Sequence, residues 1–326
     1  MGEREERADR IITRAVGSSD ALVMLQDTAG TRTRERLASE LESLDSRLRR
    51  SLKKELKQLG SDSDTPSGAS VLVMLALASS LANRAAENLR RHLRRGTAYA
   101  TKAATKQTGD LLASLEEVFE GFSPSKQLRR LGPLMEATGY SQSLLAIHET
   151  SIERYGTALV GRFEDVIRRG LIEGRTQGQI VDELTRVGGG VFTHKRWWAE
   201  RIVRTETARA YNAAKEVAYS QYATIGIVIK KKIIAIFDNR TAYDSVYVHG
   251  QVRGPGEYFI DGAGRSYLFP PGRPNDRETI IPWKSAWVDT PLTRAVSASE
   301  MPAPPKNGLR KTPENPGPIK GLLRSS

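Results

Sequence analysis

The stretch IVIKKKIIAIFD, residues 227–238, decides the fold class, because the period of the apolar residues changes there. Upstream of it, apolar residues recur every three or four positions, which is typical of amphipathic helices. Within it, β-branched residues follow closely on one another, which favours a strand. The sequence therefore predicts an α+β protein in which the N-terminal two-thirds of the chain are mainly helical.

Downstream of this stretch, the sequence predicts a small antiparallel β-rich lobe. Residues 256–272, GEYFIDGAGRSYLFPPG, should form two strands around an Asp261-Gly262 turn, and residues 279–287, TIIPWKSAW, a further short strand. The chain then becomes polar and rich in proline without any periodicity, so we expect a disordered tail that orders only on a partner, if at all. The predicted domains are a helical N-terminal region at 1–135, either compact or an extended arm, an α+β domain at 136–290, and a Pro-rich basic tail at 291–326.

Several helices are expected upstream of the lobe. Residues 31–59 carry one leucine stripe, which favours a helix packed on its own domain over an intermolecular coiled coil; the stripe consists of Leu37, Leu41, Leu44, Leu48, Leu52, Leu56 and Leu59. The most apolar run, Val71–Ala82, is too short to span a bilayer and is expected to be a buried helix. Further helices are expected over 141–172, from a capping box of Thr176 and Gln179 to about Val187, and over 196–223.

The composition restricts the partners and the chemistry. Basic residues outnumber acidic ones by 50 to 38, which gives a formal net charge of +12 and an isoelectric point near 9.9. Such a surplus favours a polyanionic neighbour such as nucleic acid. The chain has no cysteine, which excludes a disulfide, a thiolate nucleophile and a cysteine zinc site. The charged first residues, MGEREERADR, indicate no secretory signal, and we expect no membrane partner.

The densest basic stretch lies between residues 84 and 106, where Glu87 is the only acidic residue. Its side chains could contact phosphate or an acidic protein surface, or could form a solvated helix face, and the sequence favours neither reading. The basic residues are Arg84, Arg90, Arg91, Arg94, Arg95, Lys102 and Lys106.

Four motifs in order carry a resemblance to a known family. They are RGLIEGRTQGQIVDEL (169–184), ERIVRTETARAYNAA (200–214), FDNRTAYDSVYVHGQV (237–252) and FPPGRPNDRE (269–278). Over residues 167–283 the chain resembles the phage head morphogenesis family, the Mu F-like minor head proteins. The residues matched to the family's motifs are Arg204, Thr205, Glu206, Asp238, Arg240, Thr241, Gly250, Pro270, Pro271, Pro274 and Arg277.

In many members of that family, the Asp-x-Arg-Thr motif is followed by two cysteines, and the later loop reads Pro-Pro-x-His-Pro-x-Cys-Arg-Cys. That frame resembles a zinc clasp. In this chain the first two cysteine positions hold Ala242 and Ser245, the histidine position Arg273, and the last two cysteine positions Asp276 and Glu278. Every presumed ligand is replaced, so we expect neither a metal nor another cofactor.

Charged side chains at these positions suggest a substitute for the metal. We expect Arg273 and Arg277 to pair with Asp276, Glu278 or Asp244. Because exposed ion pairs contribute only ~0–1 kcal/mol each, the lobe should depend mainly on aromatic packing beneath them. The expected aromatic residues are Phe237, Tyr247, Phe259, Phe269 and Trp283.

Two catalytic interpretations are less favoured than structural ones. A carboxylate-rich nuclease site would use His249, Asp238, Asp244, Asp276 and Glu278. His249 is the only histidine of the lobe, and a lone histidine is more often structural. The second catalytic interpretation places Arg204, Thr205 and Glu206 in a nucleotide-transfer site. Because they lie on an alanine-rich helix, they are expected instead to form a polar clamp, with Arg204 or Glu206 bonding across to the β lobe.

The resemblance implies a structural protein and no enzyme. It would be a minor capsid protein of a tailed phage or prophage-derived particle, present in few copies inside the head near the portal, and in the host cytoplasm during assembly. The implied partners are the portal protein and the major capsid or scaffold protein, with packaged DNA as a non-specific contact. The alternatives are a metal-dependent nuclease or particle-delivered toxin-like effector, and a sequence-independent DNA-binding protein.

Overall fold

In a computed structural model of the protein, the described residues fall into two compact units, each built from segments that lie far apart in the sequence. The helical unit comprises the described residues of Thr28–Gly96 and Gln142–Arg204, and the α/β unit those of Thr97–Ser141 and Thr205–Ser326. The described residues are 35–58, 66–116, 140–186, 190–224, 229–235, 241–274, 276–283, 289, 293–297 and 299–301. The expected domain boundaries at 135 and 290, and the tail beyond residue 301, lie outside them.

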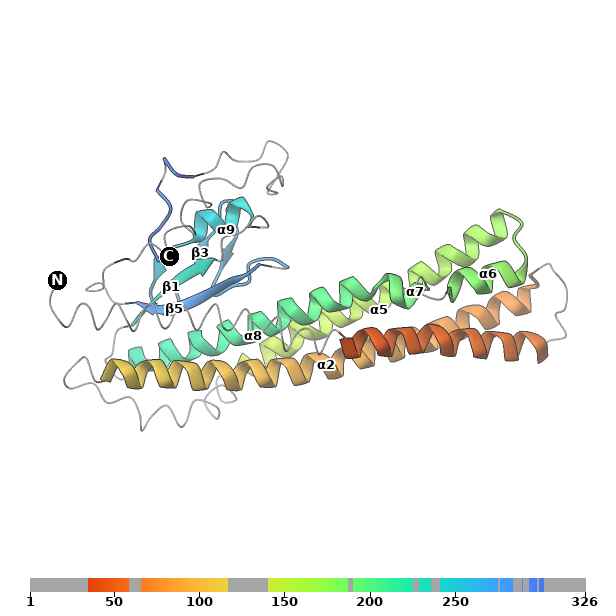
Figure 1. The fold of residues 1–326 in the computed structure, drawn as a ribbon, viewed down its shortest axis with the longest axis horizontal. Helices are drawn as coiled ribbons and strands as arrows, with labels where there is room; N and C mark the ends of the chain where they lie inside the picture. The colour runs from red at the N-terminus through yellow and green to blue at the C-terminus, as the bar shows by residue number, and fades with distance from the viewer. Residues whose placement is uncertain are drawn as a thin grey trace. The chain divides into compact units, whose positions relative to one another are not determined.

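The expected α+β class is confirmed: apart from α9, the described helices precede the strands of a small antiparallel sheet (Figure 1). A helix over residues 35–58 comes first. The other helices are α2 (Gly68–Glu116), α5 (Tyr140–Ile172), α6 (Gln177–Leu184), α7 (Val191–His194), α8 (Arg196–Thr224) and α9 (Tyr243–Val248). Both α2 and α8 contribute residues to each of the two units.

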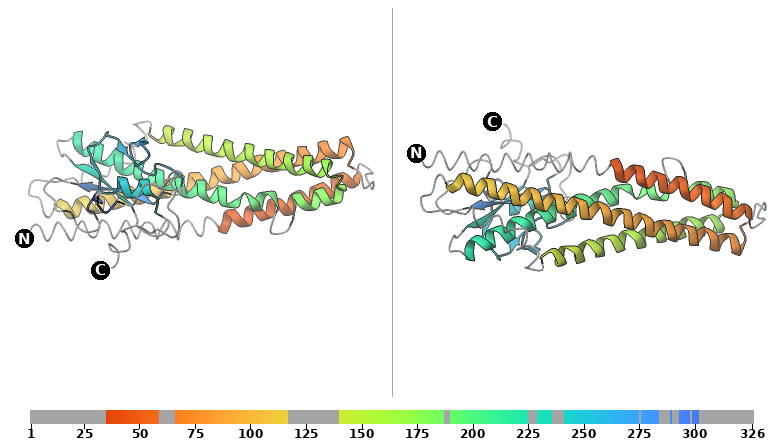
Figure 2. Two further views of the ribbon diagram at one scale, coloured as in Figure 1. Left: turned by 90° about the horizontal axis from the view of Figure 1, so that it is seen from above. Right: turned by 90° about the horizontal axis from the view of Figure 1, so that it is seen from below.

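The helical unit is held together by the predicted leucine stripe. Its six described leucines, Leu37 to Leu56, are at most 5% exposed and share one core with residues of α2 and α5. Met74, Leu89, Tyr155 and Phe163 belong to that core, and the helices that carry them run side by side in both views of Figure 2. The stripe therefore packs within its own chain, as predicted, because α2 and α5 present the matching apolar faces.

The short helix α6 begins at the predicted capping box. The hydroxyl of Thr176 accepts from the backbone N–H of Gln179, whose side chain accepts from the backbone N–H of Thr176. The helix ends at Leu184, earlier than the expected Val187, because Thr185 closes it. Both the backbone N–H and the hydroxyl of Thr185 donate to the carbonyl of Val181, at 3.1 and 2.7 Å.

Asp45, on the helix over residues 35–58, orders the start of α7. Its carboxylate accepts from the backbone N–H groups of Phe192 and Thr193 at 3.2 and 3.1 Å, and from the Thr193 hydroxyl at 2.7 Å. Gly190 leaves room for this contact, because a Cβ there would lie 2.5 Å from the carboxylate of Asp45. Burial raises the pKa of Asp45 despite these hydrogen bonds.

The apolar run Val71–Ala82 lies near the start of α2 and is only partly buried. Met74, Ala78 and Ala82 lie in the core, whereas Leu72 is 68% exposed, so the expectation of a buried helix holds for one face. In the part of the chain that the structure describes, α2 is the one helix long and apolar enough to cross a membrane, with a mean hydropathy of 1.4 over its most apolar window. Core helices of soluble proteins meet the same criterion, so this carries no membrane assignment.

The α/β unit contains the predicted strands. Strand β1 (Lys230–Ala235) lies between β2 (Val252–Arg253) and β5 (Glu278–Trp283), and both pairings are antiparallel. A second, two-stranded sheet joins β3 (Phe259–Ile260) to β4 (Ser266–Tyr267). The predicted turn at Asp261-Gly262 connects them, and Asp261 Oδ1 accepts from the backbone N–H groups of Ala263 and Arg265.

Helix α8 lies against the edge strand β5 through one asparagine. The Asn212 side-chain oxygen accepts from the backbone N–H of Ile280 at 3.1 Å, and its amide donates to the carbonyl of Glu278 at 3.3 Å. The same oxygen accepts from the Thr279 hydroxyl at 2.9 Å. Asn212 thus bonds to the strand much as a neighbouring strand would, which protects an otherwise open edge.

Candidate functional site

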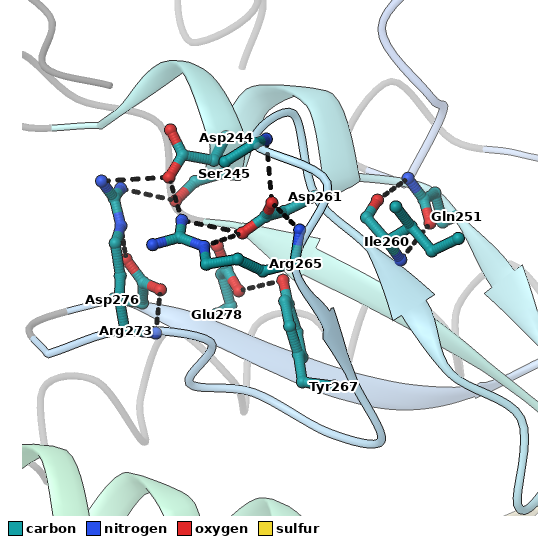
Figure 3. Close-up of polar contacts among 11 residues, drawn as sticks. Asp244, Ser245, Gln251, Ile260, Asp261, Arg265, Tyr267, Arg273, Asp276 and Glu278 are labelled. Carbon is teal, nitrogen blue, oxygen red and sulfur yellow. Dashed lines mark hydrogen bonds and ion pairs between the residues drawn. The ribbon is translucent and has the colours of Figure 1, made fainter. Parts of the chain in front are cut away.

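Four of the five residues that the resemblance matches to metal-ligand positions, Ser245, Arg273, Asp276 and Glu278, converge in the α/β unit, where they belong to what we call the charged cluster (Figure 3). Three segments supply it: α9, the β3–β4 hairpin, and the loop that leads into β5. The charged cluster consists of Asp244, Ser245, Asp261, Arg265, Tyr267, Arg273, Asp276 and Glu278.

Arg273 connects the proline-rich loop to α9. Its Nε donates to Asp276 Oδ1 at 2.6 Å, and its backbone N–H donates to the other carboxylate oxygen at 2.8 Å. Its guanidinium also lies 3.2 Å from Asp244 Oδ2 and donates to the Ser245 hydroxyl at 3.5 Å. The expected pairing of Arg273 with Asp276 and Asp244 is therefore confirmed.

A second arginine, Arg265, binds α9 to the hairpin. Its Nε donates to Asp261 Oδ2 at 2.8 Å, and its guanidinium also pairs with Asp244. The side chain of Asp244 is 3% exposed and lies between Arg265 and Arg273, so one buried carboxylate joins both arginines. The sequence did not indicate Arg265 for this position, because only the folded hairpin brings it to α9.

Glu278 is the fully buried acid of the charged cluster. Its Oε2 accepts from the Tyr267 hydroxyl at 3.1 Å, and Ser245 forms a further hydrogen bond with it. Burial, with the neighbouring Asp276, raises the pKa of Glu278 to about 8, although the hydrogen bonds and Arg273 act in the opposite direction. Glu278 is therefore mostly protonated at neutral pH.

The protonation of Glu278 reduces the excess of negative charge in the charged cluster. The charged cluster has four carboxyl groups but two guanidinium groups, and burial also raises the pKa of Asp276. Among the described residues, no three His, Asp or Glu side chains are placed so that they could hold a metal ion. The arrangement can tie α9, the hairpin and the loop together by charge-assisted hydrogen bonds, which is a structural role.

Replacing Glu278 by Gln should change how stability depends on pH. A carboxyl group whose pKa rises from 4.5 to about 8 on folding keeps its contribution below pH 4.5 and loses it as pH rises towards 8. Glutamine has no such loss, so E278Q should be more stable than the parent by about 1–3 kcal/mol at pH 9 and nearly equal to it at pH 4.5. Urea denaturation at a series of pH values measures this difference.

The control for this prediction is E153Q, which alters an exposed glutamate on α5. It should stay within about 0.5 kcal/mol of the parent at every pH. A difference between E278Q and the parent that does not grow from pH 5 to pH 9 would contradict a protonated Glu278.

The other residues matched to the family's motifs differ in burial, and two of them lie outside the described residues. Ala242 is buried and is the N-cap residue of α9, next to the charged cluster. Pro270 and Pro271 are buried and joined by a cis peptide bond, whereas Pro274 is exposed. Thr241 is buried and Arg277 half-buried, and Asp238 and Arg240 lie outside the described residues.

Gly250 has a clear backbone reason for its identity. Its φ of +79° lies in the left-handed region, and a Cβ there would lie 2.5 Å from the Cα of Ala295. Glycine is the residue that tolerates both conditions. This position therefore belongs to the fold and not to the charged cluster.

The expected aromatic support is only partly correct. Phe259 and Trp283 are buried, and Phe269 is half-buried. The expectation for Tyr247 was wrong: it is 47% exposed, with its ring centroid 6.5 Å from that of Tyr243. Tyr247 lies on helix α9, which turns it outward. Phe237 lies outside the described residues.

The RTE motif lies on α8, as its alanine-rich context predicted. Glu206 and Thr205 are buried, and Arg209 donates to both carboxylate oxygens of Glu206 at 2.5 Å. This pair joins successive turns of the same helix. The expected bond from Arg204 or Glu206 to the β lobe stays a prediction.

His249, a candidate for the nuclease interpretation, bonds to the backbone. Its Nδ1 accepts from the backbone N–H of Ala235 at 3.0 Å, and a further hydrogen bond involves the backbone of Arg294. Burial lowers its pKa to about 4, so the imidazole is neutral at physiological pH. This environment suits a structural histidine, the interpretation that the sequence favoured.

Sequence reasoning missed a second set of buried polar residues, on α8 and β1. Lys231 is fully buried, lies 2.9 Å from Glu216 and donates to the carbonyl of Leu268 at 2.7 Å. Lys215 donates to the carbonyl of Ile280 at 2.9 Å, and burial lowers its pKa to about 7. The sequence signal for a buried lysine was the run of three lysines in a predicted strand. A strand that is packed on both faces cannot expose all three side chains.

The comparisons with known proteins add no relative. The chain matches no family model, no curated protein and no solved structure.

Proposed function

We propose that this protein is a minor structural protein of a tailed-phage or prophage-derived particle, of the head morphogenesis type. It resides in few copies inside the head near the portal, and in the host cytoplasm during assembly. Its partners are the portal protein and the major capsid or scaffold protein, and it aids head assembly and the start of DNA packaging.

One observation carries the proposal. The motif order suggested that positions 245, 273, 276 and 278 correspond to the ligands of a metal clasp, although nothing in the spacing required position 245, on α9, to meet the other three. In the α/β unit these four side chains lie within one hydrogen-bonded group. Their convergence is what the resemblance requires of the fold, and it supports a common plan in which charged groups replace the metal.

The chemistry of the charged cluster favours a structural role over the nuclease alternative. The Asp261 and Asp276 carboxylates are occupied by guanidinium groups, and Glu278 is mostly protonated at neutral pH. A nuclease site instead needs ionised carboxylates free to hold a metal ion.

The test is quantitative mass spectrometry of particles purified from the strain that encodes the chain, with and without nuclease treatment. We expect the protein at low copy number relative to the major capsid protein, retained after nuclease. Its absence from particles would overturn the proposal. Its loss on digestion of exposed DNA would instead favour the alternative of a sequence-independent DNA-binding protein.

A further inference from the structure

The seven basic residues between positions 84 and 106 of α2 differ in what they contact. Arg90 is held by acidic partners: its Nε donates to Glu149 Oε1 at 2.9 Å, and its guanidinium also pairs with Glu87. The charge of Arg94 also acts on Glu149. These two arginines are therefore balanced by carboxylates, and Arg90 belongs to the packing of α2 on α5.

The other five basic residues are exposed and occupy one face of α2. Successive members are separated by seven, four, seven and four positions, so at 3.6 residues per turn they lie within a strip roughly 60° wide. At 1.5 Å per residue the strip is about 33 Å long. We call it the basic stripe, and it consists of Arg84, Arg91, Arg95, Lys102 and Lys106.

The charge of the basic stripe is not neutralised by other described residues. The guanidinium of Arg91 donates to the neutral amide oxygen of Asn88, at 3.0 Å. No ion pair joins the five side chains to a described acidic residue. The one carboxylate in this stretch of the sequence, Glu87, is already paired with Arg90. Among the described residues, the stripe therefore presents five positive charges in a row without an acidic partner.

We propose that the basic stripe binds the phosphate backbone of double-stranded DNA without regard to sequence. Duplex DNA carries one negative charge per about 1.7 Å of its axis, so a segment as long as the stripe presents on the order of twenty phosphates. Tyr99, 52% exposed beside the stripe, adds a hydroxyl of the kind that contacts phosphate. Tyr99 is the one exposed large hydrophobic side chain described between residues 84 and 106, so the described surface lacks the apolar centre of a protein interface, which disfavours an acidic protein as the partner.

This inference deepens the proposed function, since it names packaged DNA as a partner and α2 as the surface that meets it. It is tested on the purified full chain, so its outcome is independent of whether the protein is found in particles. DNA binding through the stripe combined with absence from particles would remove the particle proposal and leave this inference intact.

The experiment compares two variants of equal charge. The stripe variant carries R84Q, R91Q, R95Q, K102Q and K106Q. The control variant removes five exposed basic side chains from the helix over residues 35–58 and carries R47Q, R50Q, K53Q, K54Q and K57Q. Each variant reduces the formal net charge from +12 to +7. Circular dichroism and thermal melting verify that both are folded.

Binding is measured by fluorescence anisotropy with a duplex of mixed sequence about 30 base pairs long, at salt concentrations from 50 to 200 mM. Each phosphate contact changes the slope of log K against log salt by about 0.9, so the stripe variant should have a slope shallower by about 4. Its affinity at 50 mM salt should fall about 100-fold or more. The control variant should stay within about threefold of the parent.

Three results would overturn the inference. One is a stripe variant that binds duplex DNA like the parent, and another is an equal loss in the control variant, which would mean that net charge alone acts. The third is competition by polyglutamate as effective as by an equal charge of duplex, which would indicate an acidic protein partner. If the stripe variant does not fold, the triple variant R84Q, R91Q, R95Q should still reduce the slope by about 2.7.

Discussion

Replacing Glu216 by Ala is expected to reduce the free energy of unfolding of the α/β unit by about 3–5 kcal/mol. Glu216 lies 2.9 Å from the ammonium of Lys231, and the exposed fractions of the two side chains are 2% and 0%. Without the carboxylate, Lys231 would keep the carbonyl of Leu268 and the ring of Phe259, neither of which carries a negative charge, and the backbone N–H of Gly256 would lose its acceptor. A buried charge without a partner is among the most destabilising changes known for single substitutions.

The double variant E216L/K231M separates the cost of the lost pair from the cost of an unpaired charge. Replacing both members of a buried pair by apolar groups is often neutral or stabilising, so the double variant should recover most of the loss. The surface control is D182A, which removes the exposed partner of Arg49 and should cost at most about 1 kcal/mol.

Urea denaturation of the four proteins, followed by circular dichroism, gives the comparison. Burial raises the pKa of Glu216 and lowers that of Lys231, while their attraction opposes both changes. If E216A costs no more than D182A, then the lysine is neutral in the folded protein and the pair is a hydrogen bond between uncharged groups.

Replacing Asn212 by Leu is expected to cost about 2–4 kcal/mol, because it leaves strand β5 with unsatisfied backbone groups. The backbone N–H of Ile280 would lose its acceptor and the carbonyl of Glu278 its donor. The hydroxyl of Thr279 would lose the same acceptor, and all these groups are buried on α8 and β5. Leucine is close to asparagine in size, so a cavity contributes little.

The variant N212D separates the acceptor contacts of Asn212 from its donor contact. Its carboxylate can accept from Ile280 and Thr279 but cannot donate to the carbonyl of Glu278, so it should be less stable than the parent and improve as pH falls. Hydrogen–deuterium exchange of the β5 amides should become faster in N212L. Unchanged exchange at Ile280 would show that α8 does not protect the strand edge.

Much of the fold could be predicted from the sequence because the signals were local. The leucine stripe, the capping box of Thr176 and the turn at Asp261-Gly262 each depend on residues within a few positions of one another. Helix α9 was missed because its residues, YDSVYV, have strong strand propensity. Its burial in the α/β unit overrides that preference, which is weak compared with tertiary packing.

The sequence identified some residues of the charged cluster and missed others. The motif order pointed to Ser245, Arg273, Asp276 and Glu278, and pairing between Arg273 and Asp276 follows from a separation of three positions. Asp244 was also expected as a partner of Arg273, but the approach of Arg265 to Asp244 does not follow from any spacing, because it needs the hairpin folded against α9.

By itself, the sequence determined where most of the helices and strands lie, that the chain is strongly basic, and that charged residues occupy three of the five positions to which the resemblance points. Only the tertiary structure decided which charges are neutralised. Burial excludes water from Lys231 and Glu278 and forces each to find a partner or a neutral form, whereas the side chains of the basic stripe are exposed and have no acidic partner among the described residues. Solvent access depends on segments far apart in the chain, and this is why charge alone could not reveal it.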